Sequence, residues 1–124
     1  MRIGSLYDQT GYDHREINAT ITKLPYRIGR SHFDTAVSSL ARNELSIDDV
    51  APYHLSRNHC EIDFESGHFI LRDRGSKLGS YVNGEHISVD SGKIASTLQN
   101  GTNTIILGNE HSPHRFELTV EVLS

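Results

Sequence analysis

The stretch that decides the fold class is residues 59–73, HCEIDFESGHFILRD. In its first half, apolar side chains at every second position alternate with polar ones, as in a strand with one buried and one solvated face. These alternating apolar residues are Cys60, Ile62 and Phe64. A Glu-Ser-Gly turn follows, and residues 68–73 then place Phe69 and Leu71 on one face. The stretch therefore predicts a β-hairpin formed by residues 59–64 and 68–73.

Short apolar segments continue on both sides of this hairpin. They are residues 17–21, 26–29, 81–82, 86–89, 104–107 and 115–122. Asn83-Gly84 and Asn100-Gly101 are sequences strongly favoured in two-residue hairpin turns, and each is followed by such a segment. About ten short strands separated by turn residues favour two packed sheets, so we expect an all-β sandwich.

Residues 34–45 are the exception to this strand pattern. Their apolar residues with near-helical spacing are Val37, Leu40, Ala41 and Leu45. Asp34 begins the stretch and has a side chain that can cap the first turn of a helix. Because the stretch is short, a short helix and an irregular loop are both open interpretations.

The length of the chain, 124 residues, suits one domain with its own core and leaves little room for a second. We expect a single domain over 1–124, in which residues 1–14 are either a flexible lead-in or an extra edge strand. The single cysteine, Cys60, excludes an internal disulfide and is compatible with a reducing compartment.

Charge and hydropathy argue against two kinds of partner. The formal net charge of −4 disfavours a broad nucleic-acid surface, although it leaves room for a local positive cluster. No apolar run approaches the roughly 20 residues of a membrane span. Residues 1–12 also lack the apolar core of a secretion signal. We therefore expect no nucleic-acid or membrane contact and a cytoplasmic location.

Three motifs occur in order within the strand pattern. Residues 29–30 read GR, residues 56–59 read SRNH, and residues 73–84 read DRGSKLGSYVNG. Together they resemble the pattern of forkhead-associated (FHA) domains, which is Gly-Arg, then Ser-Arg-x-His, then Gly-Ser-x-x-Gly-Thr-x-Val-Asn-Gly. The motifs span residues 29–84, and the strand pattern around them fits the rest of the chain.

The resemblance implies both a fold and a function. The implied fold is FHA/SMAD-like, a sandwich of two twisted antiparallel sheets with about eleven strands, in which loops at one end hold the ligand. The implied function is recognition of phosphothreonine in partner proteins, the products of a Ser/Thr kinase, without catalysis and without a cofactor. Domains of this kind are usually fused to or associated with other signalling domains.

The resemblance also assigns roles by position. The residues at phosphopeptide-binding positions are Arg30, Ser56, Arg57, Lys77, Leu78 and Asn83. Of these, Arg30 and Ser56 match the phosphate contacts, Arg57 and Lys77 match further contact sites, and Asn83 matches an asparagine that braces the loops or touches the peptide backbone. The residues at positions that serve the fold are Gly29, His59 and Gly79.

The residue types themselves suit a phosphate ligand. A phosphothreonine carries about −1.5 to −2 charges and three acceptor oxygens. Arg30 supplies a planar, permanently charged fork, and Ser56 supplies a hydroxyl donor. Arg57 and Lys77 add charge, and each charge-assisted hydrogen bond contributes about 1.5–3 kcal/mol. A few such bonds are enough on an otherwise acidic protein.

Three features depart from the family pattern. Leu78 lies where many members carry an asparagine, and a leucine cannot make that side-chain bond to the peptide backbone. Ser80 replaces the usual threonine and lacks its methyl group. Residues 31–55 are longer than most members have between the first two motifs; their acids, Asp34, Glu44, Asp48 and Asp49, either bias the choice of ligand or belong to a spacer.

Other classes of function find less support in the residues. His111 and His114 flank a proline, and neither a Cys-x-x-Cys nor a His-Glu-x-x-His motif is present, so no metal site is expected. A Gly-x-Ser-x-Gly elbow and a P-loop are also absent, so no catalytic residue is expected. The alternative is an FHA-fold interaction or scaffold module that does not depend on phosphorylation.

Overall fold

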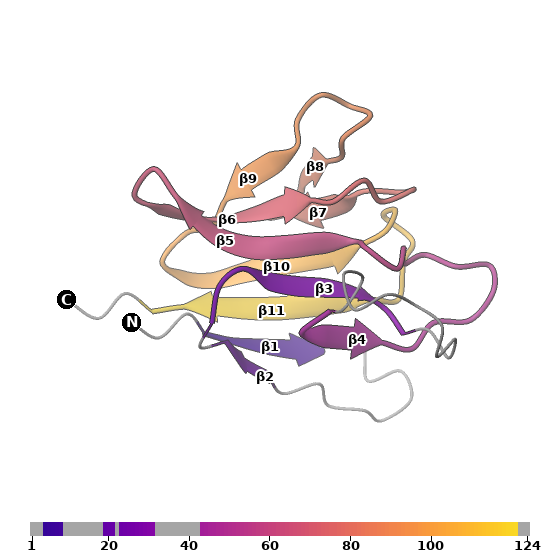
Figure 1. Cartoon of the computed structure of the whole chain (residues 1–124), viewed down its shortest axis with the longest axis horizontal. Helices are drawn as coiled ribbons and strands as arrows, with labels where there is room; N and C mark the ends of the chain where they lie inside the picture. Colours follow the sequence, from indigo (N-terminus) through magenta and orange to yellow (C-terminus); the bar gives the residue numbers. More distant parts are fainter. Residues whose placement is uncertain (1–3, 9–18, 22, 32–42, 122–124) are drawn as a thin grey trace.

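The computed structural model describes residues 4–8, 19–21, 23–31 and 43–121. Its strands are β1 (Gly4–Asp8), β2 (Ala19–Ile21), β3 (Tyr26–Arg30), β4 (Leu45–Ile47), β5 (Cys60–Glu65), β6 (His68–Asp73), β7 (Ser80–Val82), β8 (Glu85–Ile87), β9 (Ala95–Thr97), β10 (Gly101–Leu107) and β11 (Arg115–Val120). A six-stranded sheet in the order β2-β1-β11-β10-β7-β8 stacks on a five-stranded sheet in the order β4-β3-β5-β6-β9 (Figure 1). This confirms the expected all-β sandwich. Within the described residues there is no helix, and hence none long and apolar enough to cross a membrane.

One edge of the five-stranded sheet departs from the expected antiparallel pairing. β4 runs parallel to β3, with Ile28 opposite Leu45. Leu45 and Ile47 face inward and Ser46 is exposed, which is the two-residue period of a strand. Leu45 therefore does not end a helix, although its spacing allowed one. Asn43 and Glu44 are not helical either, and residues 34–42 of the expected stretch lie outside the described residues.

β1 is an interior strand of the six-stranded sheet. It pairs antiparallel with β2 on one side and with β11 on the other. Residues 4–8 therefore supply an interior strand and not an edge strand; β2 forms the edge. Residues 9–14 lie outside the described residues.

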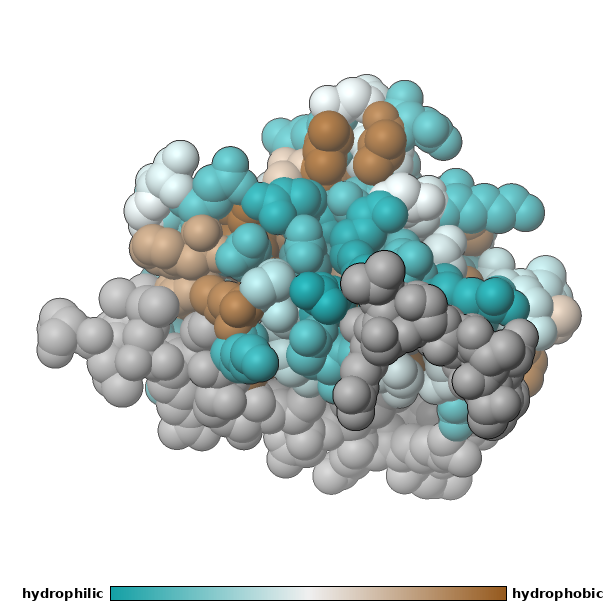
Figure 2. Space-filling model, in the orientation of Figure 1, coloured by the Kyte–Doolittle hydropathy of each residue, from teal (hydrophilic) through white to brown (hydrophobic). Residues whose placement is uncertain are grey.

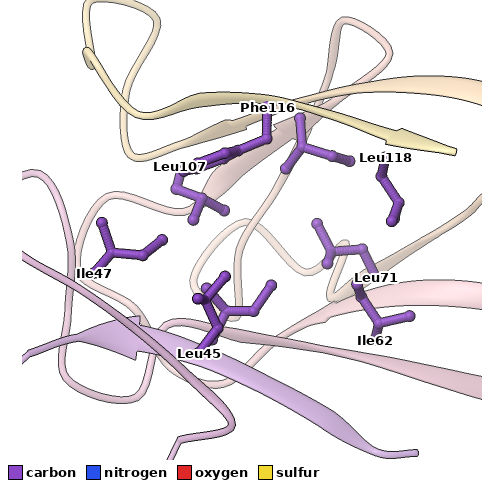
Figure 3. Close-up of a pocket in the computed structure, with 9 residues that line it drawn as sticks. Leu45, Ile47, Ile62, Leu71, Leu107, Phe116 and Leu118 are labelled. Carbon is purple, nitrogen blue, oxygen red and sulfur yellow. The ribbon is translucent and has the colours of Figure 1, made fainter. Parts of the chain in front are cut away.

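The core lies between the two sheets, whose inner side chains point toward one another (Figure 3). These side chains include Leu45, Ile47, Ile62 and Leu71 from the five-stranded sheet and Leu107, Phe116 and Leu118 from the six-stranded sheet. Along β11, Phe116, Leu118 and Val120 are all at most 2% exposed, as the alternation in the sequence predicts. Burying one such side chain stabilises the fold by about 1.5–3 kcal/mol.

The β5–β6 hairpin forms as predicted, with one difference at its tip. Cys60 and Ile62 are fully buried, but Phe64 is 44% exposed. Phe64 lies next to the turn, opposite Phe69, and the centroids of the two rings are 4.8 Å apart. Along β5 the alternating face is therefore buried only as far as Ile62, although Phe69, opposite Phe64 on β6, is buried in the core.

The two Asn-Gly sequences have different structural roles. Asn83 (φ 51°) and Gly84 (φ 85°) form the predicted tight turn between β7 and β8. Asn100-Gly101 was expected to form a second hairpin turn, and this is wrong. β9 and β10 belong to different sheets, so the chain at Asn100 crosses between layers.

The outer face of the five-stranded sheet is charged and internally paired. Arg72 donates to Glu61 at 2.9 Å and to Glu65, and it lies 3.5 Å from Asp63. Hydrophilic residues cover the middle of this face, over β5 and β6 (Figure 2). The sheet face in this region is thus solvated, and it is not an apolar surface of the kind that a partner would bury.

Candidate functional site

The site is built where β3 and β6 end and β5 begins, at the right-hand side of Figure 1. Arg30 is the last residue of β3, and its backbone N–H donates to the carbonyl of Ser56 at 2.9 Å. Gly29 makes this approach possible, because a Cβ atom there would lie 1.9 Å from the carbonyl oxygen of Arg57. The first motif therefore needs a glycine for close packing against the second motif.

Ser56 lies at the centre of the loop contacts. Its backbone N–H donates to Nδ1 of His59 at 3.0 Å, and its hydroxyl oxygen accepts from the backbone N–H of Lys77 at 2.9 Å. Because the hydroxyl accepts this bond, its own hydrogen is available to donate to a ligand. Ser56 thus links the loop before β5 to the loop after β6 and keeps one donor.

His59 is a buried, neutral support beneath this loop. Its Nδ1 accepts a hydrogen bond, so the proton is on Nε2, which donates to the carbonyl of Gly79 at 2.8 Å and lies 3.0 Å from the Ser80 hydroxyl. Burial lowers the pKa of His59. The His59 ring bonds to the backbone N–H of Ser56 and not to its hydroxyl. Ser56 and His59 therefore do not have the nucleophile–base geometry of a hydrolase.

The loop of residues 74–79 is shaped by two buried residues that the sequence analysis did not assign. Asp73 accepts from the Ser76 hydroxyl and, at 2.9 Å, from the backbone N–H of Val89. The Ser76 hydroxyl oxygen in turn accepts from the backbone N–H of Gly79 at 2.9 Å. The loop so fixed presents Lys77 exposed and Leu78 half-buried.

Asn43 cross-links the second and third motifs from outside. Its side-chain amide donates to the carbonyl of Arg57 at 2.7 Å, and its side-chain oxygen accepts from Arg74 at 2.8 Å. Arg74 also reaches the side chain of Asn58 at 3.2 Å. The side chain of Arg57 itself is exposed, beside Ser56.

Asp49 organises the loop that precedes Ser56. Its carboxylate accepts from the backbone N–H groups of His54 and Leu55 at 2.8 and 2.9 Å and from Nε2 of His114 at 2.9 Å. Burial raises the pKa of Asp49, but these hydrogen bonds outweigh burial and hold it below the ordinary value. The side chain is only 3% exposed, so Asp49 is neither a ligand-facing acid nor part of a spacer.

Tyr53, on the same loop, lies against Arg30. The guanidinium carbon of Arg30 is 3.9 Å from the centroid of the Tyr53 ring. The ring is half-exposed and comes from a part of the chain with no motif. No sequence signal marked it, because the contact joins residues from two different loops.

Asn83 is not brought to this cluster. It lies at the β7–β8 turn, and β7 separates it from Gly79. Its side chain donates to Asn103 at 2.9 Å and accepts from the backbone N–H of Thr104 at 2.9 Å. These bonds fasten the turn to β10, which is a bracing role at the far end of the strand.

The assembled end of the sandwich is suited to an anion. Four basic residues lie on its three loops, namely Arg30, Arg57, Arg74 and Lys77. Two of the acids in the same region, Asp49 and Asp73, are committed to hydrogen bonds inside the loops. Among the described residues, no three metal-ligating side chains are grouped, and His114 bonds to Asp49. The chemistry on offer is hydrogen bonding to a phosphate-like group.

Comparison with known proteins agrees with this geometry. Residues 26–108 match the sequence model of the FHA domain, and no curated protein matches the chain. The fold is similar to Mycobacterium tuberculosis EmbR in complex with a low-affinity phosphopeptide, at 22% identity and a TM-score of 0.65. That match covers 98% of this chain but only 25% of EmbR.

Two similar structures match this chain over nearly their whole length. The FHA domain of CT664 from Chlamydia trachomatis has 22% identity and a TM-score of 0.62, and the match covers 99% of this chain and 100% of that one. An FHA structure from an analysis of phosphothreonine-dependent FHA domain interactions has 20% identity and a TM-score of 0.62, with coverage of 100% and 99%. At these identities the likeness shows a shared fold.

Proposed function

The chain belongs to the FHA domain family, and from this membership we propose that it binds phosphothreonine-containing segments of other proteins. The domain acts as an interaction module and catalyses nothing itself. The ligand is the product of a Ser/Thr kinase in the same compartment, which we take to be the cytoplasm. The domain serves a signalling protein or assembly to which it is fused or bound.

The convergence of Arg30, Ser56 and Lys77 carries this proposal. Two hydrogen bonds of 2.9 Å hold these residues together. The backbone N–H of Arg30 donates to the carbonyl of Ser56, and the backbone N–H of Lys77 donates to the Ser56 hydroxyl. The guanidinium fork, the remaining hydroxyl hydrogen and the ammonium group then supply the donors that three phosphate oxygens need. Arg57 adds charge beside them, and Leu78, which follows Lys77 in the chain, offers an apolar side chain.

Two of the similar structures fit the same ligand class, because EmbR is in complex with a phosphopeptide and another concerns phosphothreonine-dependent FHA domain interactions. We propose that phosphothreonine is preferred over phosphoserine, because its methyl group can pack against an apolar part of the site. Full burial of that methyl is worth about 0.8 kcal/mol, or roughly fourfold in affinity.

An oriented peptide library with a fixed phosphothreonine tests this function, with unphosphorylated and phosphoserine libraries as controls. We expect selective retention of the phosphothreonine library, and titration calorimetry on matched peptides selected from it should give the order phosphothreonine, phosphoserine, threonine. Equal affinity for all three would instead favour an interaction module that does not depend on phosphorylation.

A further inference from the structure

The contact between Arg30 and Tyr53 is a feature that phosphate binding alone does not require. The guanidinium carbon lies over the Tyr53 ring at 3.9 Å from its centroid, within the range of a cation–π interaction. A contact this close excludes water from one side of the cation. The ring attracts the charge without accepting any of the N–H donors that lie in the plane of the guanidinium group.

The loop holds Tyr53 in place although its side chain is 52% exposed. The next two residues, His54 and Leu55, both donate backbone N–H bonds to the buried carboxylate of Asp49. Leu55 is also buried in the core, which anchors the loop directly after the ring. Tyr53 is thus a well-fixed aromatic residue that makes no contribution to the core between the sheets.

We propose that Tyr53 is a positioning residue for Arg30, holding the guanidinium group so that its donors face the phosphate of the ligand. The proposal rests on the proposed function. A pre-positioned arginine loses less side-chain freedom when it binds, so the ring strengthens binding without touching the ligand. The same stacking predicts that the aromatic face, and not the tyrosine hydroxyl, is what the site needs.

Three variants separate this role from a structural one and from a direct contact. Tyr53→Phe keeps the aromatic face and removes the hydroxyl, whereas Tyr53→Leu keeps an apolar side chain and removes the face. Val50→Ala is the matched control, because Val50 is an apolar residue on the same loop and is 80% exposed. Since both positions are exposed, we expect all three proteins to fold. The urea midpoint should be unchanged in Tyr53→Phe and Val50→Ala, and Tyr53→Leu should lower it only by the small amount that the stacking contributes.

Affinity is measured with a fluorescent pool of short peptides that carry a central phosphothreonine and degenerate flanks. We expect Tyr53→Leu to weaken binding about fivefold, equivalent to about 1 kcal/mol, while Tyr53→Phe and Val50→Ala stay within about twofold of the wild type. The NMR resonance of the Arg30 Nε–H group gives a readout without ligand. Ring currents should shift it in the wild type and in Tyr53→Phe but not in Tyr53→Leu.

The outcomes distinguish the positioning role from the function it serves. If the wild type binds the peptides and Tyr53→Leu binds them equally well, the positioning role is overturned and the proposed function still stands. Equal losses in Tyr53→Phe and Tyr53→Leu would overturn it in favour of a hydroxyl contact to the ligand. A wild-type protein that binds no phosphothreonine peptide would overturn the proposed function, and the positioning role with it.

Discussion

Nδ1 of His59 accepts a hydrogen bond of 3.0 Å from the backbone N–H of Ser56, so the central loop of the site rests on a histidine that must be neutral. On its other side, Nε2 of the same ring bonds to the carbonyl of Gly79 at 2.8 Å. A second proton on the ring would place two N–H groups against each other and break the link to Ser56. The loops before β5 and after β6 are therefore joined by the His59 ring only while that ring is neutral.

This link predicts that stability falls in mildly acidic solution. Burial lowers the pKa of His59 in the folded protein below the ordinary value of 6.5. Below about pH 6.5 the unfolded chain therefore binds a proton that the folded chain does not, so stability is fully present above that pH and is lost as the pH falls toward the folded pKa. Urea unfolding between about pH 8 and about pH 5 measures the slope.

Replacing single histidines assigns that slope. His59→Gln should flatten the dependence on pH, at the expense of overall stability. His111→Gln should leave it intact, because the side chain of His111 is 83% exposed. A wild-type slope that survives in His59→Gln would show that another group titrates.

The packing of Gly29 predicts a large effect of a small substitution. In Gly29→Ala the new Cβ would lie 1.9 Å from the carbonyl oxygen of Arg57, and that backbone atom cannot move without displacing the Ser56 loop. We expect a loss of about 3 kcal/mol or more in the free energy of unfolding, together with weaker peptide binding per folded molecule.

Gly92→Ala provides the comparison for Gly29→Ala. Gly92 has a φ of +85°, and a Cβ atom there would meet nothing within 4 Å beyond its chain neighbours, so only backbone strain opposes alanine. This substitution should lower stability by about 1 kcal/mol and leave binding unchanged. Similar losses at both glycines, measured by urea unfolding, would contradict the role of close packing at Gly29.

Much of the fold could be predicted from the sequence because its signals are local. Alternating residues in β5, β6 and β11 and the Asn83-Gly84 turn depend on neighbours in the chain. The errors occur where the partner is distant. Leu45 has spacing that fits a helix, but pairing with β3 makes it part of a strand. Asn100-Gly101 has turn chemistry, but its flanking strands join different sheets.

The candidate site divides in the same way. Arg30, Ser56 and Lys77 lie in motifs, and the structure brings these three together. Asp49 and Tyr53 carry no local signal, since His114 and Arg30, with which they pair, come from distant parts of the chain. The sequence shows only the charge of Asp49, whereas its structural role comes from burial and hydrogen bonding.

Asp49 yields a prediction about the loop that carries Tyr53 and Ser56. In Asp49→Asn one oxygen is replaced by an NH₂ group that cannot accept. That group faces either the backbone N–H groups of His54 and Leu55, or the backbone N–H of Val50 together with His114, depending on how the amide is turned. Leaving such buried donors unsatisfied should lower the free energy of unfolding by about 1–3 kcal/mol, as measured by urea unfolding. Asp90→Asn, at an exposed aspartate, is the control and should change little. An Asp49→Asn protein as stable as the wild type would contradict the anchoring role.

Arg30 provides the most direct separation of binding from folding. Its side chain is half-exposed, and its stacking on Tyr53 contributes about 0.5–1 kcal/mol, so Arg30→Ala should lower stability only modestly, as is usual for surface contacts. Phosphopeptide affinity should fall at least about tenfold, equivalent to about 1.4 kcal/mol. Arg30→Lys should recover part of the affinity, because it keeps the charge and loses the planar fork.

A variant at a paired surface cation controls for net charge. Lys93 is exposed and bonds to Glu85 at 3.0 Å. Lys93→Ala should therefore change neither the free energy of unfolding nor the phosphopeptide affinity strongly. His59→Ala should behave in the opposite way to Arg30→Ala, losing stability while keeping the affinity of the molecules that remain folded. Titration calorimetry and urea unfolding on all four variants decide the matter. If Arg30→Ala unfolds the domain while binding per folded molecule survives, Arg30 is structural, and recognition of a partner without phosphate takes the place of the phosphothreonine site.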